Sequence, residues 1–152
     1  MQARIASPTA AVPGAVPALR ALGEALKRSG VPESTLLLVY LRTSQINGAS
    51  WNVDRHAAEM RAAGEPPERI AAVAAWRDAP YYSDAERAAL LLAESAARLG
   101  DRPDAVPDAV WHEAARHFDE SQLATLVLAS GFCNLWHRVV ATTRRPAGQP
   151  PG

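Results

Sequence analysis

The chain has 152 residues, which suits one domain of ordinary size, and 48% of them are hydrophobic, so it can build a core. Its 16 basic side chains balance 16 acidic ones, which argues against a protein that binds nucleic acid or an anionic membrane. The single cysteine, Cys133, excludes an intramolecular disulfide, a CxxC redox centre and a Cys-rich zinc site. We therefore expect a single globular domain over residues 1–146.

The sequence does not favour a membrane protein. Its most apolar stretch, residues 123–135, is short and contains Ser130 and Asn134. The N-terminal segment carries prolines where a signal peptide needs a continuous apolar run. We expect a cytoplasmic protein without a membrane span, and a disordered tail over residues 147–152.

Apolar residues recur at intervals of three and four, and prolines and glycines divide the chain into segments of helical length. The predicted class is therefore all-α, with six to seven helices. In chain order they cover residues 16–28, 32–47, 49–63, 67–77, 83–100, 107–118 and 121–143. Ser83 with Glu86, and Asp119 with Gln122, have the spacing of capping boxes, in which two side chains satisfy backbone N–H groups of the first turn.

The segment LRTSQINGASWNVDRH, residues 41–56, joins the second and third predicted helices. One helix ends at Asn47 and Gly48, and the next begins at once with positions 49, 52 and 56 on one face. A turn and a helix face brought together in this way form a favourable place for a site.

This segment resembles the signature of the carboxymuconolactone decarboxylase superfamily, in its alkylhydroperoxidase AhpD-type branch. The family pattern has an acidic residue, then LR-x-SQ-x-NG, then C-x-x-C and a histidine four residues after the second cysteine. The similarity extends to residues 74–95, to residues 104–129 and to the N-x-W-x-R segment that begins at Asn134, so it covers most of residues 3–146. The resemblance implies an AhpD-like all-helical protomer that assembles into homo-trimers or homo-hexamers.

The residues that carry the family's chemistry are mostly replaced. The two cysteines of the family fall on Ala49 and Asn52, its relay glutamate falls on Leu37, and only the histidine, His56, is kept. Peroxide reduction by this family needs a thiolate that attacks the peroxide and a second thiol that resolves the sulfenic acid. We therefore expect no dithiol peroxidase activity.

The departures from the family pattern gather in or beside the motif, at Leu37, Ala49, Trp51, Asn52 and Arg55. His137 also stands where many relatives carry an amide. Random drift would scatter such changes, so we interpret them as a rewritten pocket, which arose either by natural divergence or by engineering of the scaffold.

The last helix carries the stripe Leu126, Ser130, Cys133 and His137. Cys133 and His137 are neighbours across one turn, and a histidine that takes the thiol proton would make a nucleophile for esters or other electrophiles. Two alternatives stay open. Cys133 can be a small core residue with His137 hydrogen-bonded at an interface, or these two residues can bind a metal with His56.

His56 is the second candidate for proton transfer, because the ordinary pKa of histidine suits acid–base work near neutral pH. Arg55 could hold a carboxylate or an oxyanion, or it could pair with Glu59. Leu37, Tyr40 and Trp51 would make a pocket apolar and flat-walled, which suits a small hydrophobic or aromatic substrate, although the same residues also serve ordinary helix packing.

The sequence thus favours a non-redox enzyme of decarboxylase, isomerase or hydrolase type. Its catalytic candidates are His56, His137 and Cys133, and its pocket candidates are Leu37, Tyr40, Ala49, Trp51, Asn52, Arg55 and Ser130. We expect no cofactor and no metal, since no phosphate loop, dinucleotide fingerprint or HExxH motif occurs. One alternative is a catalytically silent family member that binds a ligand in the same cavity. Another is a protein that is alkylhydroperoxidase-like in family only.

Overall fold

A computed structural model describes residues 2–101 and 103–148. Within these residues the chain forms seven α-helices, two short 3-10 helices and no strand. The α-helices are α1 (Ala15–Lys27), α2 (Glu33–Ile46), α3 (Ser50–Ala62), α4 (Pro67–Ala71), α5 (Asp84–Ala97), α6 (Asp108–Ala115) and α7 (Glu120–Thr143). The 3-10 helices are η1 (Ala72–Ala75) and η2 (Leu99–Asp101). The all-α prediction is confirmed.

Three predicted helices end differently in the structure. The fourth changes from α to 3-10 geometry after Ala71, because the chain turns there to bring Trp76 under α5, where the indole Nε1–H donates to Glu94 at 3.0 Å. The fifth ends at Ala97 rather than Gly100, and the sixth ends at Ala115 rather than Phe118. Both capping boxes are present, and they fix the starts of α5 and α7.

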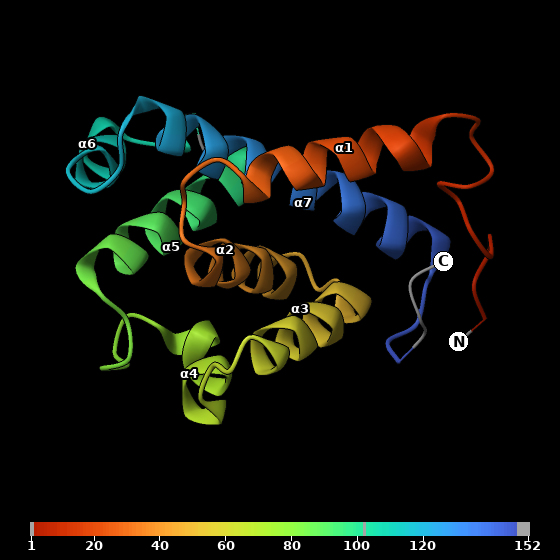
Figure 1. Cartoon of the computed structure of the whole chain (residues 1–152), viewed down its shortest axis with the longest axis horizontal. Helices are drawn as coiled ribbons and strands as arrows, with labels where there is room; N and C mark the ends of the chain where they lie inside the picture. Colours follow the sequence, from red (N-terminus) through yellow and green to blue (C-terminus); the bar gives the residue numbers. More distant parts are fainter. Residues whose placement is uncertain (1, 102, 149–152) are drawn as a thin grey trace.

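Helix α2 lies at the centre and packs against α3, α5 and α7 (Figure 1). Eight of the ten residues from Thr35 to Ser44 are buried, all except Tyr40 and Arg42, which explains why this helix shows little amphipathic pattern. One buried cluster joins α2 to α5, α6 and α7, and a second joins α2 to α3, α4 and η1. Tyr40 contacts both clusters.

The turn between α2 and α3 is tight. Gly48 adopts a φ of 61°, in the left-handed region that favours glycine, and the Ala49 N–H donates to the Ser44 carbonyl at 3.0 Å. This turn places the first residues of α3 directly beside the end of α2.

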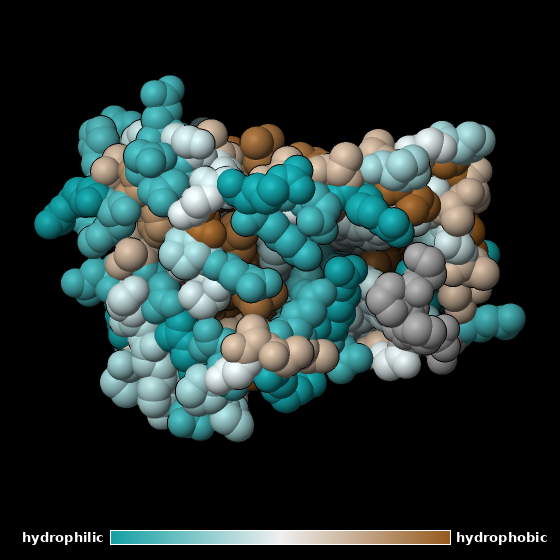
Figure 2. Space-filling model, in the orientation of Figure 1, coloured by the Kyte–Doolittle hydropathy of each residue, from teal (hydrophilic) through white to brown (hydrophobic). Residues whose placement is uncertain are grey.

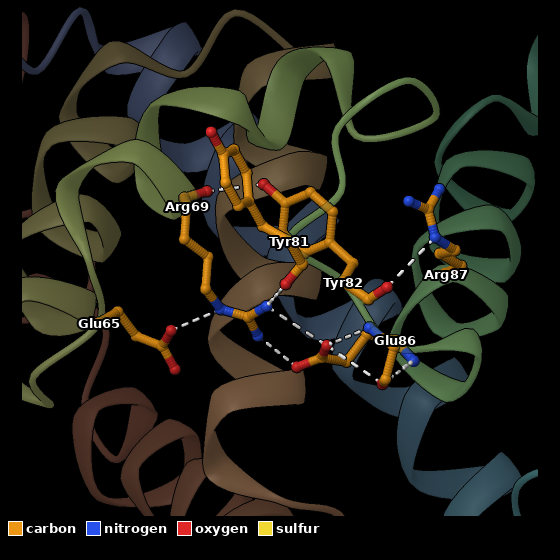
Figure 3. A network of polar contacts seen from close by, with 7 residues as sticks. Glu65, Arg69, Tyr81, Tyr82, Glu86 and Arg87 are labelled. Atoms are coloured by element: carbon orange, nitrogen blue, oxygen red, sulfur yellow. Dashed lines mark hydrogen bonds and ion pairs between the residues drawn. The ribbon is translucent and has the colours of Figure 1, made fainter.

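Arginines fasten the segment between α4 and α5. Arg69 extends between Glu65 on one side and Glu86 on the other, and also donates to the Tyr81 carbonyl (Figure 3). Tyr82 returns a hydrogen bond from its hydroxyl to the Arg69 carbonyl at 2.6 Å. This network joins α4 to the start of α5 and to the segment before it.

Helix α7 is long and apolar enough, by length and composition alone, to cross a membrane. However, 44% of its most apolar window is buried inside the fold, where α7 packs against α2 and α5. We therefore regard α7 as a core helix. Residues 149–152 of the tail for which we expect disorder lie outside the described residues, whereas the Gly148 N–H donates to Asp54 at 3.1 Å.

Candidate functional site

A cavity of about 630 Å³ lies between α1, α2, α3 and α7. Its inner wall is formed by buried or half-buried side chains, which are Leu37, Tyr40, Asn52, His56 and Cys133. Its rim carries exposed charged side chains of both signs, among them Arg20, Glu24, Lys27, Glu33 and Arg55. Figure 2 shows one face of the molecule, on which hydrophobic surface is seen in recesses between hydrophilic residues.

His56 is held by a carboxylate on its own helix. Its Nδ1 lies 2.7 Å from Glu59 Oε2, and the other oxygen of Glu59 accepts from Arg55 Nε at 2.9 Å. Burial alone would raise the pKa of Glu59, but the hydrogen bonds and charges of His56 and Arg55 outweigh it and lower this pKa to about 2. Glu59 is therefore ionised at neutral pH and accepts the Nδ1 proton, which leaves Nε2 as the basic nitrogen of neutral His56.

Two further polar groups face this part of the cavity. The Tyr40 ring lies 5.3 Å from the His56 ring, and Asn52 precedes His56 by one helical turn. Asn52 is 3% exposed, and its Oδ1 is buried with no hydrogen-bond partner among the described residues. Burial raises the pKa of Tyr40, with smaller contributions from Cys133 and Glu59, so its phenol stays protonated at neutral pH.

Cys133 lines the cavity, but its environment does not activate the thiol. The side chain is 3% exposed, and burial raises its pKa to about 12 although Thr43 and Arg55 act in the opposite direction. A thiol with this pKa contains almost no thiolate at neutral pH, and the thiolate is the nucleophilic form.

His137 is buried away from the cavity, in a hydrogen-bond network between α7 and α2. Its Nε2 lies 2.9 Å from Ser44 Oγ, whose own hydroxyl donates to the Tyr40 carbonyl at 2.7 Å, so Nε2 carries the proton. Its Nδ1 accepts from Asn47 Nδ2 at 2.8 Å. Burial, with the charges of His56 and Arg138, lowers the pKa of His137 to about 4. With both nitrogens engaged, His137 does not accept a proton from Cys133.

The structure brings together some of the residues predicted for the site and separates others. Those that line the cavity are Leu37, Tyr40, Asn52, Arg55, His56 and Cys133. The described residues that line the cavity do not include four of the predicted ones, which are Ala49, Trp51, Ser130 and His137. Ala49 is buried at the start of α3, Ser130 donates to the Leu126 carbonyl within α7, and Arg55 and Arg145 lie over the Trp51 ring.

Sequence reasoning missed two parts of the site. The first is the role of Glu59 toward His56, for which the spacing of three residues on one helix is a sufficient signal. The second is the wall formed by α1, with Val16, Leu19 and Gly23, for which the sequence holds no signal because α1 is remote in the chain. Phe132 and Trp136 of α7 complete the cavity.

The metal alternative finds no support in the geometry. Within residues 2–101 and 103–148, no group of three or more His, Cys, Asp and Glu side chains is arranged to hold a metal ion. Cys133 and His56 share the cavity, but His137 lies outside it.

Comparison with known proteins places this geometry in a family. Residues 13–95, more than half of the chain, match the model of the carboxymuconolactone decarboxylase family. The chain is 35% identical over 124 residues to the uncharacterized protein YdfG of Bacillus subtilis strain 168, covering 81% of this chain and 83% of YdfG. It is 33% identical over 121 residues to the uncharacterized protein YnjA of Escherichia coli K12, covering 80% of this chain and 65% of YnjA.

Solved structures show the same fold. Atu0492 of Agrobacterium tumefaciens, a protein of unknown function proposed to be the antioxidant defence protein AhpD, superposes with a TM-score of 0.89 at 28% identity, over 98% of this chain and all of that one. The debrominase Bmp8 superposes with a TM-score of 0.78 at 18% identity, over 88% of this chain and 70% of Bmp8, a likeness of fold alone. These matches and the all-helical architecture establish that the chain belongs to the carboxymuconolactone decarboxylase family, with an AhpD-like fold.

Proposed function

We propose that the chain is a non-redox enzyme for a small molecule, with His56 as its acid–base group. The observation that carries this proposal is the 2.7 Å contact between His56 Nδ1 and the Glu59 carboxylate in the cavity wall. A carboxylate that holds one ring nitrogen fixes the tautomer and the orientation of the imidazole, and directs the other nitrogen toward the substrate. Glu59 is therefore a positioning residue and His56 the catalytic one.

The thiol chemistry of AhpD-type proteins does not fit these residues. Ala49 and Asn52 occupy the positions where the family motif has cysteines, and Cys133 is a single, buried thiol with a raised pKa. We expect no dihydrolipoamide-dependent reduction of alkyl hydroperoxides above the rate without protein. Turnover in that assay would contradict the non-redox proposal.

The cavity suits a small hydrophobic or aromatic ligand. Its volume lies within the range of small-molecule sites, and apolar and aromatic side chains from α1, α2 and α7 line it. The fold is compatible with such a ligand, since a variant of the debrominase Bmp8 has been crystallised with 2,3,4-tribromopyrrole.

The test is a panel of uncharged aromatic esters, lactones and ketones, assayed with the unmodified chain and with His56→Gln. We expect turnover of at least one compound and a loss of about 100-fold or more in His56→Gln, which is the usual contribution of a general acid or base. The matched control is His112→Gln, because His112 is an exposed histidine on α6 and far from the cavity lining.

A catalytically silent binding protein is the second candidate. It is favoured by two residues that the sequence nominates for catalysis, because His137 uses both nitrogens in buried structural contacts and Cys133 is a cavity-wall thiol whose pKa is raised by burial. Saturable binding of a compound from the panel, with no turnover and no effect of His56→Gln, would select this candidate over an enzyme.

A further inference from the structure

Three polar groups in the inner wall of the cavity have unused hydrogen-bonding capacity. They are Asn52 Oδ1, the Tyr40 hydroxyl and His56 Nε2, none of which bonds to another described residue. Buried polar groups are normally satisfied, and Asn52 Oδ1 is the one of the three that is buried with no partner, so this atom indicates that a bound molecule supplies a partner in this wall. Asn52 is the strongest of the three, because its Oδ1 is fully buried and accepts nothing.

Each group requires a different feature of that molecule. Asn52 Oδ1 is an acceptor and needs a hydroxyl or N–H, the protonated Tyr40 phenol is a donor and needs an oxygen, and His56 Nε2 is a base and needs an acidic hydrogen. Tyr40 and His56 lie with their rings 5.3 Å apart, and Asn52 and His56 are one turn apart on α3. The three groups therefore belong to one wall of the cavity, where a single small ligand could contact all of them.

The charges around the cavity favour a neutral molecule. Glu59 is the acidic group nearest to His56, and it is already paired with His56 and Arg55. At the rim, Lys27 pairs with Glu24 at 3.6 Å. Arg20 and Glu33 add one charge of each sign to the rim, and Leu37 from α2 with Phe132 and Trp136 from α7 make the inner wall largely apolar or aromatic.

We propose that the cavity binds an uncharged aromatic α-hydroxy ketone and that His56 removes the proton from its hydroxyl-bearing carbon, with Tyr40 donating to the ketone oxygen and Asn52 Oδ1 accepting from the hydroxyl. This inference rests on the proposed function, for which it names a substrate class. A ketone makes the neighbouring C–H acidic, and a donor aimed at its oxygen stabilises the negative charge that develops there.

The step balances without an oxidant or a cofactor. The C–H bond breaks, its proton passes to His56 Nε2, its electron pair forms a C=C bond, and the carbonyl π pair moves to the oxygen held by Tyr40. Return of a proton from His56 to the same carbon regenerates the ketone. Return to the neighbouring carbon, with the hydroxyl proton passing to the former ketone oxygen, gives the isomeric α-hydroxy aldehyde.

The probe is 2-hydroxyacetophenone in D₂O near neutral pD, with exchange of its CH₂ protons followed by ¹H NMR and binding followed by line broadening. We expect exchange at least about tenfold above the rate in buffer, and a fall to the buffer rate in His56→Gln. Tyr40→Phe and Asn52→Leu should each lower the exchange rate by about 10- to 100-fold, since each removes one hydrogen bond to the reacting atoms.

Matched controls separate these effects from changes in folding. Tyr81→Phe alters an exposed tyrosine and His112→Gln an exposed histidine, and both should exchange the probe at the unmodified rate. Acetophenone lacks the hydroxyl, so Asn52→Leu should leave its binding unchanged while weakening that of 2-hydroxyacetophenone. If Asn52→Leu does not fold, the preference of the unmodified chain for 2-hydroxyacetophenone over acetophenone provides the same information.

The outcomes distinguish the two proposals. No binding of the probe, or binding without exchange, overturns the hydroxy-ketone assignment. If another compound of the panel is then turned over in a His56-dependent manner, the acid–base function stands. If no compound is turned over, both proposals fall together.

Discussion

His56 and His137 are both buried histidines, yet their ring nitrogens have different hydrogen-bond partners. His56 shares only Nδ1 with a described residue and keeps Nε2 for the cavity. His137 uses both nitrogens, one with Ser44 and one with Asn47, and it ties α7 to α2. A histidine with both nitrogens engaged is a structural group, whatever its distance from a thiol in sequence.

The buried, neutral state of His137 predicts a loss of stability in acid. The unfolded chain binds a proton at this position near pH 6.5, whereas the folded chain binds it only near pH 4, so the free energy of unfolding should fall as the pH drops from 6.5 to 4. The full shift corresponds to about 3 kcal/mol, and partial solvent screening reduces it to about 1–2 kcal/mol. Urea unfolding at pH values from 4 to 7.5 measures it.

The variant His137→Gln keeps an amide for hydrogen bonding but cannot titrate. Its free energy of unfolding should change less between pH 6.5 and 4 than that of the unmodified chain, whereas the exposed control His112→Gln should follow the unmodified chain. Equal pH dependence in His137→Gln and the unmodified chain would mean that His137 is not the group responsible.

Cys133 should react slowly with alkylating reagents. Because burial raises its pKa to about 12, the folded chain should be alkylated at pH 8 at least about 100-fold more slowly than the same chain in denaturant. His137→Ala should not slow the reaction further, because His137 does not accept the thiol proton. Rapid alkylation that is lost in His137→Ala would restore the Cys–His pair.

Sequence patterns located a buried face of α3 but not the partners of its residues. Helical spacing groups positions 49, 52 and 56, and all three residues are buried. Spacing along one helix could also have assigned Glu59 to His56, whereas the burial of Trp51 outside the cavity and the absence of His137 from the cavity depend on contacts with other parts of the fold. Periodicity predicts which side of a helix is buried, but it does not predict which other helices that side contacts.

At the scale of helices, the starts were the most predictable features. Ser83 and Asp119 each accept from the backbone N–H three residues later, and Glu86 and Gln122 return the bond to the backbone, as the sequence predicts. The helix ends were less predictable, because α4 passes into η1, where Trp76 reaches Glu94, and α5 ends at Ala97, before the chain forms η2. Local chemistry sets a cap, while packing sets where a helix stops.

The cap of α7 should contribute measurably to stability. Asp119→Ala removes the acceptor of the Gln122 N–H at 2.8 Å, and we expect the free energy of unfolding to fall by about 1 kcal/mol. Glu120→Ala, the next residue and outside the capping box, is the matched control and should change stability by less than about 0.5 kcal/mol. Thermal or urea unfolding measures both, and equal effects would remove the cap as the cause.

At the scale of the whole molecule, α7 has two apolar faces. Cys133 and Leu126 lie on the buried face, whereas Val127, Leu128 and Leu135 are exposed, Leu128 by 55%. Exposed apolar residues gathered along one helix commonly mark a contact with another protein surface. We propose that a second copy of the chain covers this face, in line with the oligomer that the family resemblance implies.

We therefore expect a trimer or hexamer in solution, measured by light scattering against the 16.2 kDa of one chain. Leu128→Glu should shift the mass toward that of the monomer, because it places a charge on the apolar face. Leu99→Glu, at an exposed leucine outside α7, should leave the assembly unchanged. A monomeric mass for the unmodified chain would contradict the expected assembly.

The two faces of α7 also make assembly and ligand binding subject to one thermodynamic constraint. Phe132, Cys133 and Trp136 belong to the cavity wall, and they alternate along the helix with the exposed residues on its other side. If association with a second copy strengthens ligand binding by a given free energy, the ligand must strengthen the association of the copies by the same free energy. Titrating the assembled mass against ligand concentration would therefore measure a property of the cavity without any need to observe the cavity itself.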